Sequence, residues 1–179
     1  MPRSLMVNVR TQNLIENTLI AGRYIQQLEG EGMKEKQRCR AMAVIKGSSA
    51  VPQLSGVVWL TDSPAGVRVE ARVKGLPPNE TGFYGFHLHE RGSCVQPDFT
   101  SAKGHYNPTG APHPQHAGDF PMLMATSADD AWLSFVTTRF SVCDVIGRSI
   151  VIHAERDDYT SQPAGDAGTR IGCGIIQAI

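Results

Sequence analysis

The chain has 179 residues, with 17 Lys or Arg side chains and 17 Asp or Glu side chains, so its formal net charge is zero. A balanced charge gives no reason to expect a polyanionic partner, and we expect no binding to nucleic acid or to a membrane surface. The length fits one domain with an appendage, and 41% hydrophobic residues suffice to fill a core. Eighteen Gly and 11 Pro indicate many turns and favour an all-β fold over long helices.

The first part of the chain has a helical pattern. Apolar residues recur at intervals of about four between Leu14 and Leu28, which is typical of a helix with one apolar stripe. We therefore predict an N-terminal extension over residues 1–39 that contains a short helix, followed by the main domain over residues 40–179.

The beginning of the chain also bears on localisation. It lacks the apolar block of a secretory signal, which disfavours secretion by that route. Arg3, Arg10 and Arg23 stand against a single acid in residues 1–23, a composition that weakly resembles an organelle transit peptide. We expect a cytoplasmic protein, with organelle targeting by the extension as the alternative.

From residue 40 onward the apolar period changes to two. Between Val67 and Val73, apolar residues alternate with charged ones, which predicts a strand with one buried face. Further strand candidates, rich in Val, Ile, Phe and Trp, cover residues 41–46, 54–61, 83–89, 132–142, 149–154 and 171–176. About seven strands in this part of the chain suit a sandwich or a Greek-key barrel.

Two long segments do not read as strands. Residues 90–121 are rich in Gly and Pro, and residues 155–170 are rich in Asp, Gly and Ser. Loops of this length inside a compact domain are usually functional, so something other than an apolar core must hold them in place.

All six histidines lie at or beside these two segments. His87 and His89 fall on one predicted strand, where side chains two positions apart point the same way and could share an ion. His105, His113 and His116 together with Asp119 make a complete tetrahedral zinc set. Chance histidines on a polar strand face and a solvated loop are the alternative, but the grouping favours a binuclear metal centre.

Several short motifs in this order resemble the copper-zinc superoxide dismutase family. The resemblance covers about residues 40–179, and the His113 to His116 spacing is closer to bacterial-type members. An N-terminal extension of this kind is atypical. The matching segments are Gly-Phe-His-Leu-His-Glu at 85–90, Gly-His-Tyr-Asn-Pro at 104–108, His-Ala-Gly-Asp at 116–119, Val-Ile-His at 151–153 and Gly-Thr-Arg-Ile-Gly-Cys-Gly at 168–174.

The resemblance implies specific roles for the metal ligands. It assigns copper to His87, His89, His105 and His153, and zinc to His105, His113, His116 and Asp119. His105 would bridge the two metals and would act in catalysis both as a ligand and as a proton carrier.

The resemblance also implies roles for residues around the metals. Arg170 would be catalytic, attracting and orienting a small anion beside copper. Asp157 would be the outer carboxylate that joins a copper-ligand imidazole to a zinc-ligand imidazole.

By the same resemblance, Cys94 and Cys173 would form an intrasubunit disulfide. Cys39 and Cys143 have no family role, and we expect them to be free thiols.

The expected fold is an eight-stranded Greek-key β-barrel or sandwich, immunoglobulin-like, with two long loops organised by metal. The expected function is superoxide dismutation with copper and zinc as cofactors. The alternatives are a non-enzymatic copper- and zinc-binding module and a copper-delivery module on the same fold. The resemblance implies superoxide as the small-molecule substrate, and a homodimer and a copper chaperone as partners.

Overall fold

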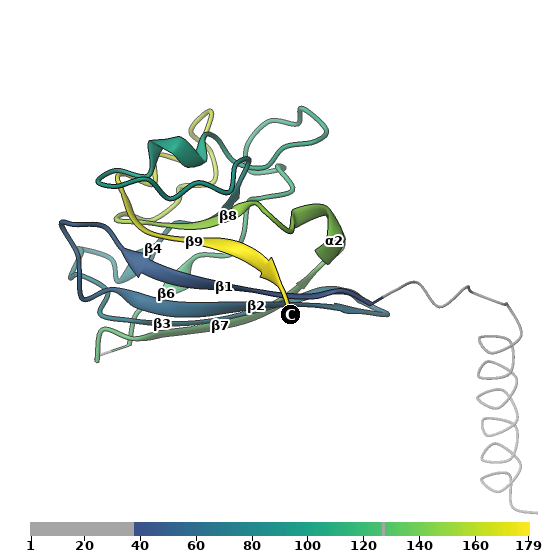
Figure 1. Ribbon diagram of the computed structural model, residues 1–179. Coiled ribbons are helices and arrows are strands. Elements are labelled where there is room, and N and C mark those ends of the chain that lie inside the picture. The colour runs from purple at the N-terminus through teal and green to yellow at the C-terminus, as the bar shows by residue number, and fades with distance from the viewer. Residues whose placement is uncertain (1–37, 127) are drawn as a thin grey trace, which may run out of the picture. The chain divides into compact units, whose positions relative to one another are not determined.

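The computed structural model describes residues 38–126 and 128–179, and the predicted N-terminal helix lies outside these residues. Nearly all regular structure in the described part is β, which confirms the predicted class (Figure 1). The elements are β1 (Arg40–Gly47), β2 (Ser55–Ser63), β3 (Gly66–Lys74), β4 (Phe83–Tyr84), β5 (Phe86–His89), η1 (Thr100–Ala102), β6 (Leu123–Met124), β7 (Ala131–Thr137), α2 (Val142–Val145), β8 (Ser149–His153) and β9 (Arg170–Ala178).

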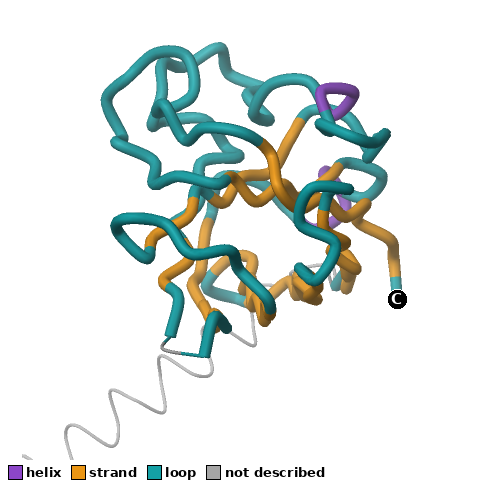
Figure 2. The backbone as a smooth tube through the Cα atoms, turned by 90° about the vertical axis from the view of Figure 1, so that its left-hand side faces the viewer, coloured by secondary structure: helices purple, strands orange, loops and turns teal. Residues whose placement is uncertain are grey.

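Seven strands form one antiparallel sheet in the order β5-β8-β9-β1-β2-β3-β7, and β4 pairs with β6 in a second, two-stranded sheet. After β3 the chain crosses to the far edge to form β5, and after β7 it crosses back to form β8 beside β5. Such crossings between non-neighbouring strands are typical of Greek-key folds. The sheet curls around the core, and the long loops gather on one side of it (Figure 2).

The predicted alternation of buried and exposed residues is confirmed on β3. Val67, Val69, Ala71 and Val73 are at most 1% exposed, whereas the Arg68 and Arg72 side chains between them point to solvent. Strand β3 therefore contributes its apolar face to the main core.

Two predicted strands differ from the structure, and one short strand was not predicted. The segment 83–89 is divided at Gly85, whose main chain bonds to Glu155 and His153 instead of continuing one ladder. The segment 132–142 ends as a strand at Thr137 and is followed by α2. The two-residue strand β6 gave no alternating pattern that could have been recognised.

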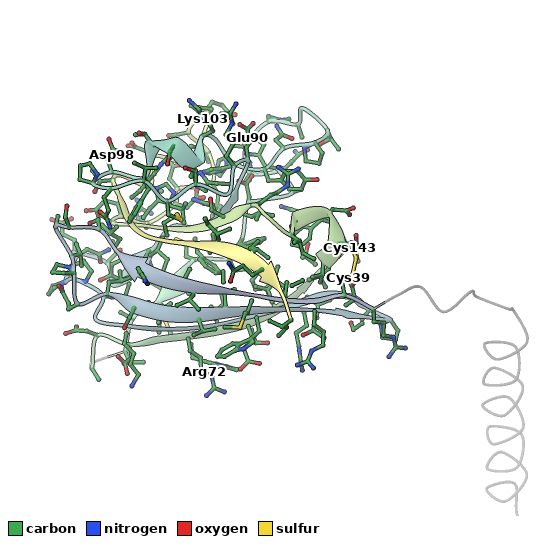
Figure 3. All side chains as sticks on the ribbon, viewed as in Figure 1. Cys39, Arg72, Glu90, Asp98, Lys103 and Cys143 are labelled. Atoms are coloured by element: carbon green, nitrogen blue, oxygen red, sulfur yellow. A yellow bond between two sulfur atoms is a disulfide. The ribbon has the colours of Figure 1, made fainter. Side chains whose placement is uncertain are left out.

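The prediction that Cys39 and Cys143 are free thiols is wrong, because they form a disulfide with a Cα–Cα distance of 5.9 Å (Figure 3). Asp62 brings the two segments together: its carboxylate accepts the Cys39 amide at 3.0 Å and the Val142 amide at 3.1 Å. The disulfide thus ties the start of β1 to α2. No helix in the described residues is both long and apolar enough to span a membrane.

Candidate metal centre

Four histidines from three parts of the fold meet at the loop side of the sheet. His87 and His89 lie on β5, His153 ends the adjacent β8, and His105 lies in the long loop, joined to His89 by an isolated antiparallel bridge. Each offers one ligand atom, and these atoms all lie within 4.8 Å of one another. We call these four residues the first cluster.

A second cluster consists of His105, His113, His116 and Asp119, whose ligand atoms also lie within 4.8 Å of one another. The loop that carries it runs against β5, where the Leu88 amide donates to the Gly118 carbonyl at 2.9 Å. A Cβ atom on Gly118 would lie 2.2 Å from the Leu88 carbonyl oxygen, so only glycine permits this approach. His105 belongs to both clusters.

Several ring nitrogens in the two clusters lack hydrogen-bond partners. This observation tests whether the clusters can bind metal. His87 Nδ1, His105 Nε2, His113 Nδ1 and His116 Nδ1 are buried and have no hydrogen-bond partner. Buried polar atoms are normally satisfied, because an unpaired one costs about 1–3 kcal/mol. Imidazole and carboxylate donors at this spacing suit copper and zinc, so the residues fit a two-metal centre.

In two further rings of the first cluster, one ring nitrogen is held by a main-chain carbonyl. His89 Nδ1 donates to the Lys103 carbonyl at 2.9 Å, and His153 Nδ1 donates to the Gly168 carbonyl at 3.2 Å. Such partners set the tautomer and the orientation of a ligand ring.

Asp157 joins the two clusters from outside. Its carboxylate accepts His87 Nε2 at 2.7 Å and His113 Nε2 at 3.0 Å, and it is 1% exposed. A Cβ atom on Gly165 would lie 2.0 Å from Asp157 Oδ1, so glycine at this position leaves room for the carboxylate. The structure therefore places Asp157 between one imidazole of each cluster.

Burial disfavours the charged form of three histidines of the first cluster, His87, His89 and His153. Desolvation, followed by repulsion from neighbouring imidazoles, lowers the pKa of His87 and His89 well below 6.5. Desolvation lowers the pKa of His153 to about 4. Burial alone would raise the pKa of Asp119, but hydrogen bonds from His105 and from the His116 amide lower it overall. Neutral imidazoles and an ionised carboxylate are the forms that bind metal.

Arg170 begins β9 beside the first cluster and pairs in register with His153. Its Nη1 donates to the Phe99 carbonyl and its Nη2 donates to the Lys103 carbonyl, each at 2.7 Å. The Lys103 oxygen thus holds both Arg170 and His89. Desolvation lowers the pKa of Arg170, whereas the nearby Asp98 carboxylate raises it.

Lys103 is the residue of this site that the sequence did not reveal. Its backbone has φ 65° and ψ −149°, a region that is essentially restricted to glycine. Lys103 lies with Glu90 and Asp98 among the loops on this side of the sheet (Figure 3). A main-chain acceptor leaves no side-chain pattern, so no sequence signal could have found it.

The loop before His105 is tied to the last strand by a disulfide. Cys94 and Cys173 are bonded, with a Cα–Cα distance of 5.7 Å. Cys173 packs with Phe99, Ala102 and Val151 in a small apolar cluster under the loop. This cluster supports the carbonyls that hold Arg170.

The chain matches the family model described as copper/zinc superoxide dismutase (SODC) over residues 54–176. It is 40% identical over 139 residues to superoxide dismutase [Cu-Zn] 2 of Aquifex aeolicus, covering 70% of this chain and 80% of that protein. It is 37% identical over 147 residues to superoxide dismutase [Cu-Zn] of Deinococcus radiodurans, covering 71% and 79% of the two chains.

A solved structure is similar as well. The crystal structure of a double mutant of a SOD-like protein from Bacillus subtilis superposes with a TM-score of 0.66 at 29% identity, covering 76% of this chain and 96% of that chain. The fold and the two clusters define a two-metal protein of the β-barrel class. The chain belongs to the copper/zinc superoxide dismutase family, whose two metals are copper and zinc.

Proposed function

We propose that the protein is a superoxide dismutase, which converts two superoxide anions and two protons into hydrogen peroxide and dioxygen. The first cluster would hold copper and the second cluster would hold zinc. The observation that carries this proposal is the position of His105: its Nδ1 contacts Asp119 of the second cluster at 2.7 Å, while its Nε2 is buried and unpartnered. One imidazole can therefore serve both metals.

When bound, copper supplies the one-electron reduction and reoxidation that dismutation needs, whereas zinc has no redox chemistry. His105 would act as ligand and proton carrier at Nε2, which is buried and has no hydrogen-bond partner, because its other ring nitrogen is held at Asp119. Asp119 of the second cluster would keep the ring in place during the transfer, because its carboxylate lies 2.7 Å from Nδ1. Asp157 resists rotation of His87 and His113 from the opposite side.

Arg170 would bind and orient the superoxide anion. A guanidinium has five N–H donors, and two of them are used on the carbonyls of Phe99 and Lys103. The remaining donors are available to an anion, and the two carbonyl bonds fix the plane in which they point. A fixed cation attracts and aligns a small anion without reorganisation during the reaction.

The assignment of the clusters is tested by one substitution in each. In His153→Ala we expect elemental analysis to show loss of copper with zinc retained, and in His116→Ala loss of zinc with copper retained. Dismutation should disappear in the first variant and persist at a reduced rate in the second. Loss of both metals together in folded protein, or activity in His153→Ala, would contradict the assignment.

We propose a second copy of the chain as a partner. Val44 on β1 and Ile175 on β9 are 50% and 38% exposed and lie on adjacent strands beside a groove that Phe99 also lines. Val44→Glu should lower the mass measured by sedimentation equilibrium if this face pairs. Val136→Glu, at a 51% exposed position on β7, is the matched control and should leave the measured mass unchanged.

We also propose a copper chaperone as a partner for loading the first cluster. Its four histidines are at most 6% exposed, so a delivery protein would help copper to reach them in the cell. Copper content of protein expressed with and without a copper-delivery protein would test this. Equal loading in both cases would contradict it.

For localisation, we propose an oxidising compartment in place of the cytoplasm expected from the sequence. All four cysteines of the chain are paired in two disulfides, and stable disulfides are rare in the reducing cytosol. Alkylation of rapidly quenched cells, followed by mass analysis, should find Cys39 and Cys143 unmodified. Alkylation of both cysteines would contradict this proposal.

A further inference from the structure

The second cluster lies on a short loop that has an outer face as well as a face toward the metal ligands. Three of its four donors fall between His113 and Asp119. Inside the loop, Asp119 Oδ2 accepts the His116 amide at 2.9 Å. The His116 carbonyl accepts the Asp119 amide at 3.2 Å, and carbonyls of the same segment have further partners from outside the loop.

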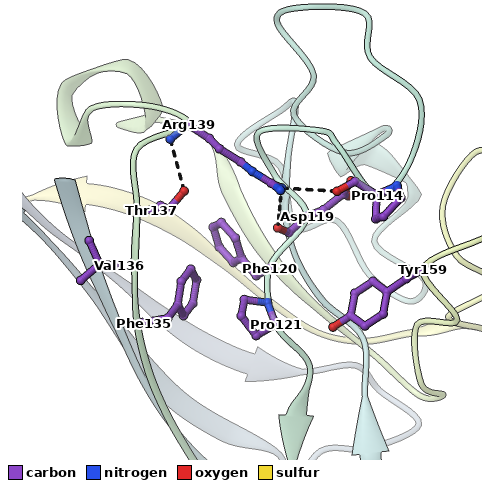
Figure 4. A pocket seen from close by; sticks show the side chains of 9 residues that line it. All are labelled: Pro114, Asp119, Phe120, Pro121, Phe135, Val136, Thr137, Arg139 and Tyr159. Atoms are coloured by element: carbon purple, nitrogen blue, oxygen red, sulfur yellow. Dashed lines mark hydrogen bonds between the residues drawn. The ribbon is translucent and has the colours of Figure 1, made fainter. Parts of the chain in front are cut away.

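Those partners come from Arg139, which lies between β7 and α2 and belongs to neither cluster. Its Nη1 lies 2.9 Å from the His116 carbonyl oxygen. It also lies 3.2 Å from the carbonyl oxygen of Asp119 and 3.4 Å from that of Pro114, two contacts drawn in Figure 4. One cationic group thus gathers three carbonyls from the segment that carries most of the second cluster. Hydrogen bonds from a charged donor are stronger than those between neutral groups.

The main chain at Arg139 is also held in place. The Arg139 amide donates to Thr137 Oγ1 at 3.2 Å. Next to Asp119, the Phe120 ring packs on Phe135 and Phe140, with ring centroids 5.1 and 6.0 Å apart. The loop is therefore attached to β7 and to the segment that follows it at two points, one apolar and one polar.

We propose that Arg139 is a positioning residue for zinc: it holds residues 113–119 so that His113, His116 and Asp119 converge on one ion. This inference rests on the proposed assignment of zinc to the second cluster. Arg139 raises the affinity for zinc and leaves the affinity of the first cluster for copper unchanged, because its three contacts all fall on the second cluster's loop.

Removing Arg139 should leave the protein folded. The side chain is exposed and borders an open pocket of about 400 Å³, so water can reach the released carbonyls. The substitution therefore changes the geometry of the loop, and through it the affinity for metal.

The test is the zinc dissociation constant of Arg139→Ala, measured by chelator competition, with Co²⁺ as a spectroscopic probe of ligand geometry in the second cluster. We expect zinc affinity to fall about 10- to 100-fold, as for other groups that orient metal ligands, and the Co²⁺ absorption bands to shift. Copper affinity should match that of the unchanged protein. Arg139→Lys should recover part of the zinc affinity, and Arg72→Ala, an exposed arginine on β3, is the matched control and should show no change.

Unchanged zinc affinity in Arg139→Ala would overturn the proposal. So would an equal loss of thermal stability in the metal-free and zinc-loaded forms, because a merely structural tether would act on both alike. If the unchanged protein binds no zinc, the proposed function fails instead, and the two failures are thereby distinguished.

Discussion

The disulfide between Cys39 and Cys143 should stabilise the fold chiefly by restricting the unfolded chain. The two cysteines are 104 residues apart, and loop-closure entropy for such a loop corresponds to about 4.7 kcal/mol at 25 °C. Cys94 lies within this loop and is bonded to Cys173 outside it, so the unfolded chain is already restricted. We therefore expect the double variant Cys39→Ser/Cys143→Ser to lose about 2–4 kcal/mol of unfolding free energy.

The native contacts around the disulfide should survive this change. Asp62 accepts the amides of both Cys39 and Val142 whether or not the sulfurs are bonded. Urea unfolding of the metal-free protein measures the effect, with the Cys94–Cys173 bond verified by mass analysis in both samples. A larger denaturant slope should accompany the loss, because the unfolded chain becomes less compact. A loss below about 1 kcal/mol would refute the argument from chain entropy.

Three further predictions concern the site. Asp157→Asn should weaken copper and zinc binding together by about 10- to 100-fold in chelator competition, since Asp157 orients one imidazole of each cluster; weakening of one metal alone would contradict that role. Lys103→Gly should raise the unfolding free energy by about 1 kcal/mol in urea, because glycine adopts this backbone region without strain; a decrease would show that the Lys103 side chain is needed. The metal-free protein should lose stability as the pH falls from about 6.5 towards 4, because His87, His89 and His153 have lowered pKa values when folded and the unfolded chain binds their protons first. Each contributes up to about 1.4 kcal/mol per pH unit, and urea midpoints that stay level between pH 7 and pH 5 would contradict it.

The fold class and the donor residues could be predicted from sequence because their signals are local. Alternation in the segment around Val69 follows directly from the geometry of a half-buried strand, and it is present in the structure. His87 and His89 share one face of β5 for the same reason. The grouping of the histidines around two loops needed only their positions in the chain.

The remaining features depend on contacts between distant segments. Cys39 meets Cys143 only because Asp62 on β2 accepts amides from both neighbourhoods, and no spacing rule encodes that. Arg139 contacts main-chain carbonyls, and because all residues possess these, no sequence pattern marks the contact. The division at Gly85 follows from hydrogen bonds to Glu155 and His153 near the second long loop. Pairing of this kind is decided by tertiary structure rather than by local pattern.

The central claim is a copper and a zinc sharing His105, with activity that depends on copper. The most direct test is elemental analysis of the protein before and after reconstitution with copper and zinc, with superoxide dismutation assayed on both samples. We predict one copper and one zinc per chain after reconstitution, and activity that follows copper content. Zinc alone, with no dismutation even after copper loading, would contradict the claim and leave a metal-stabilised scaffold.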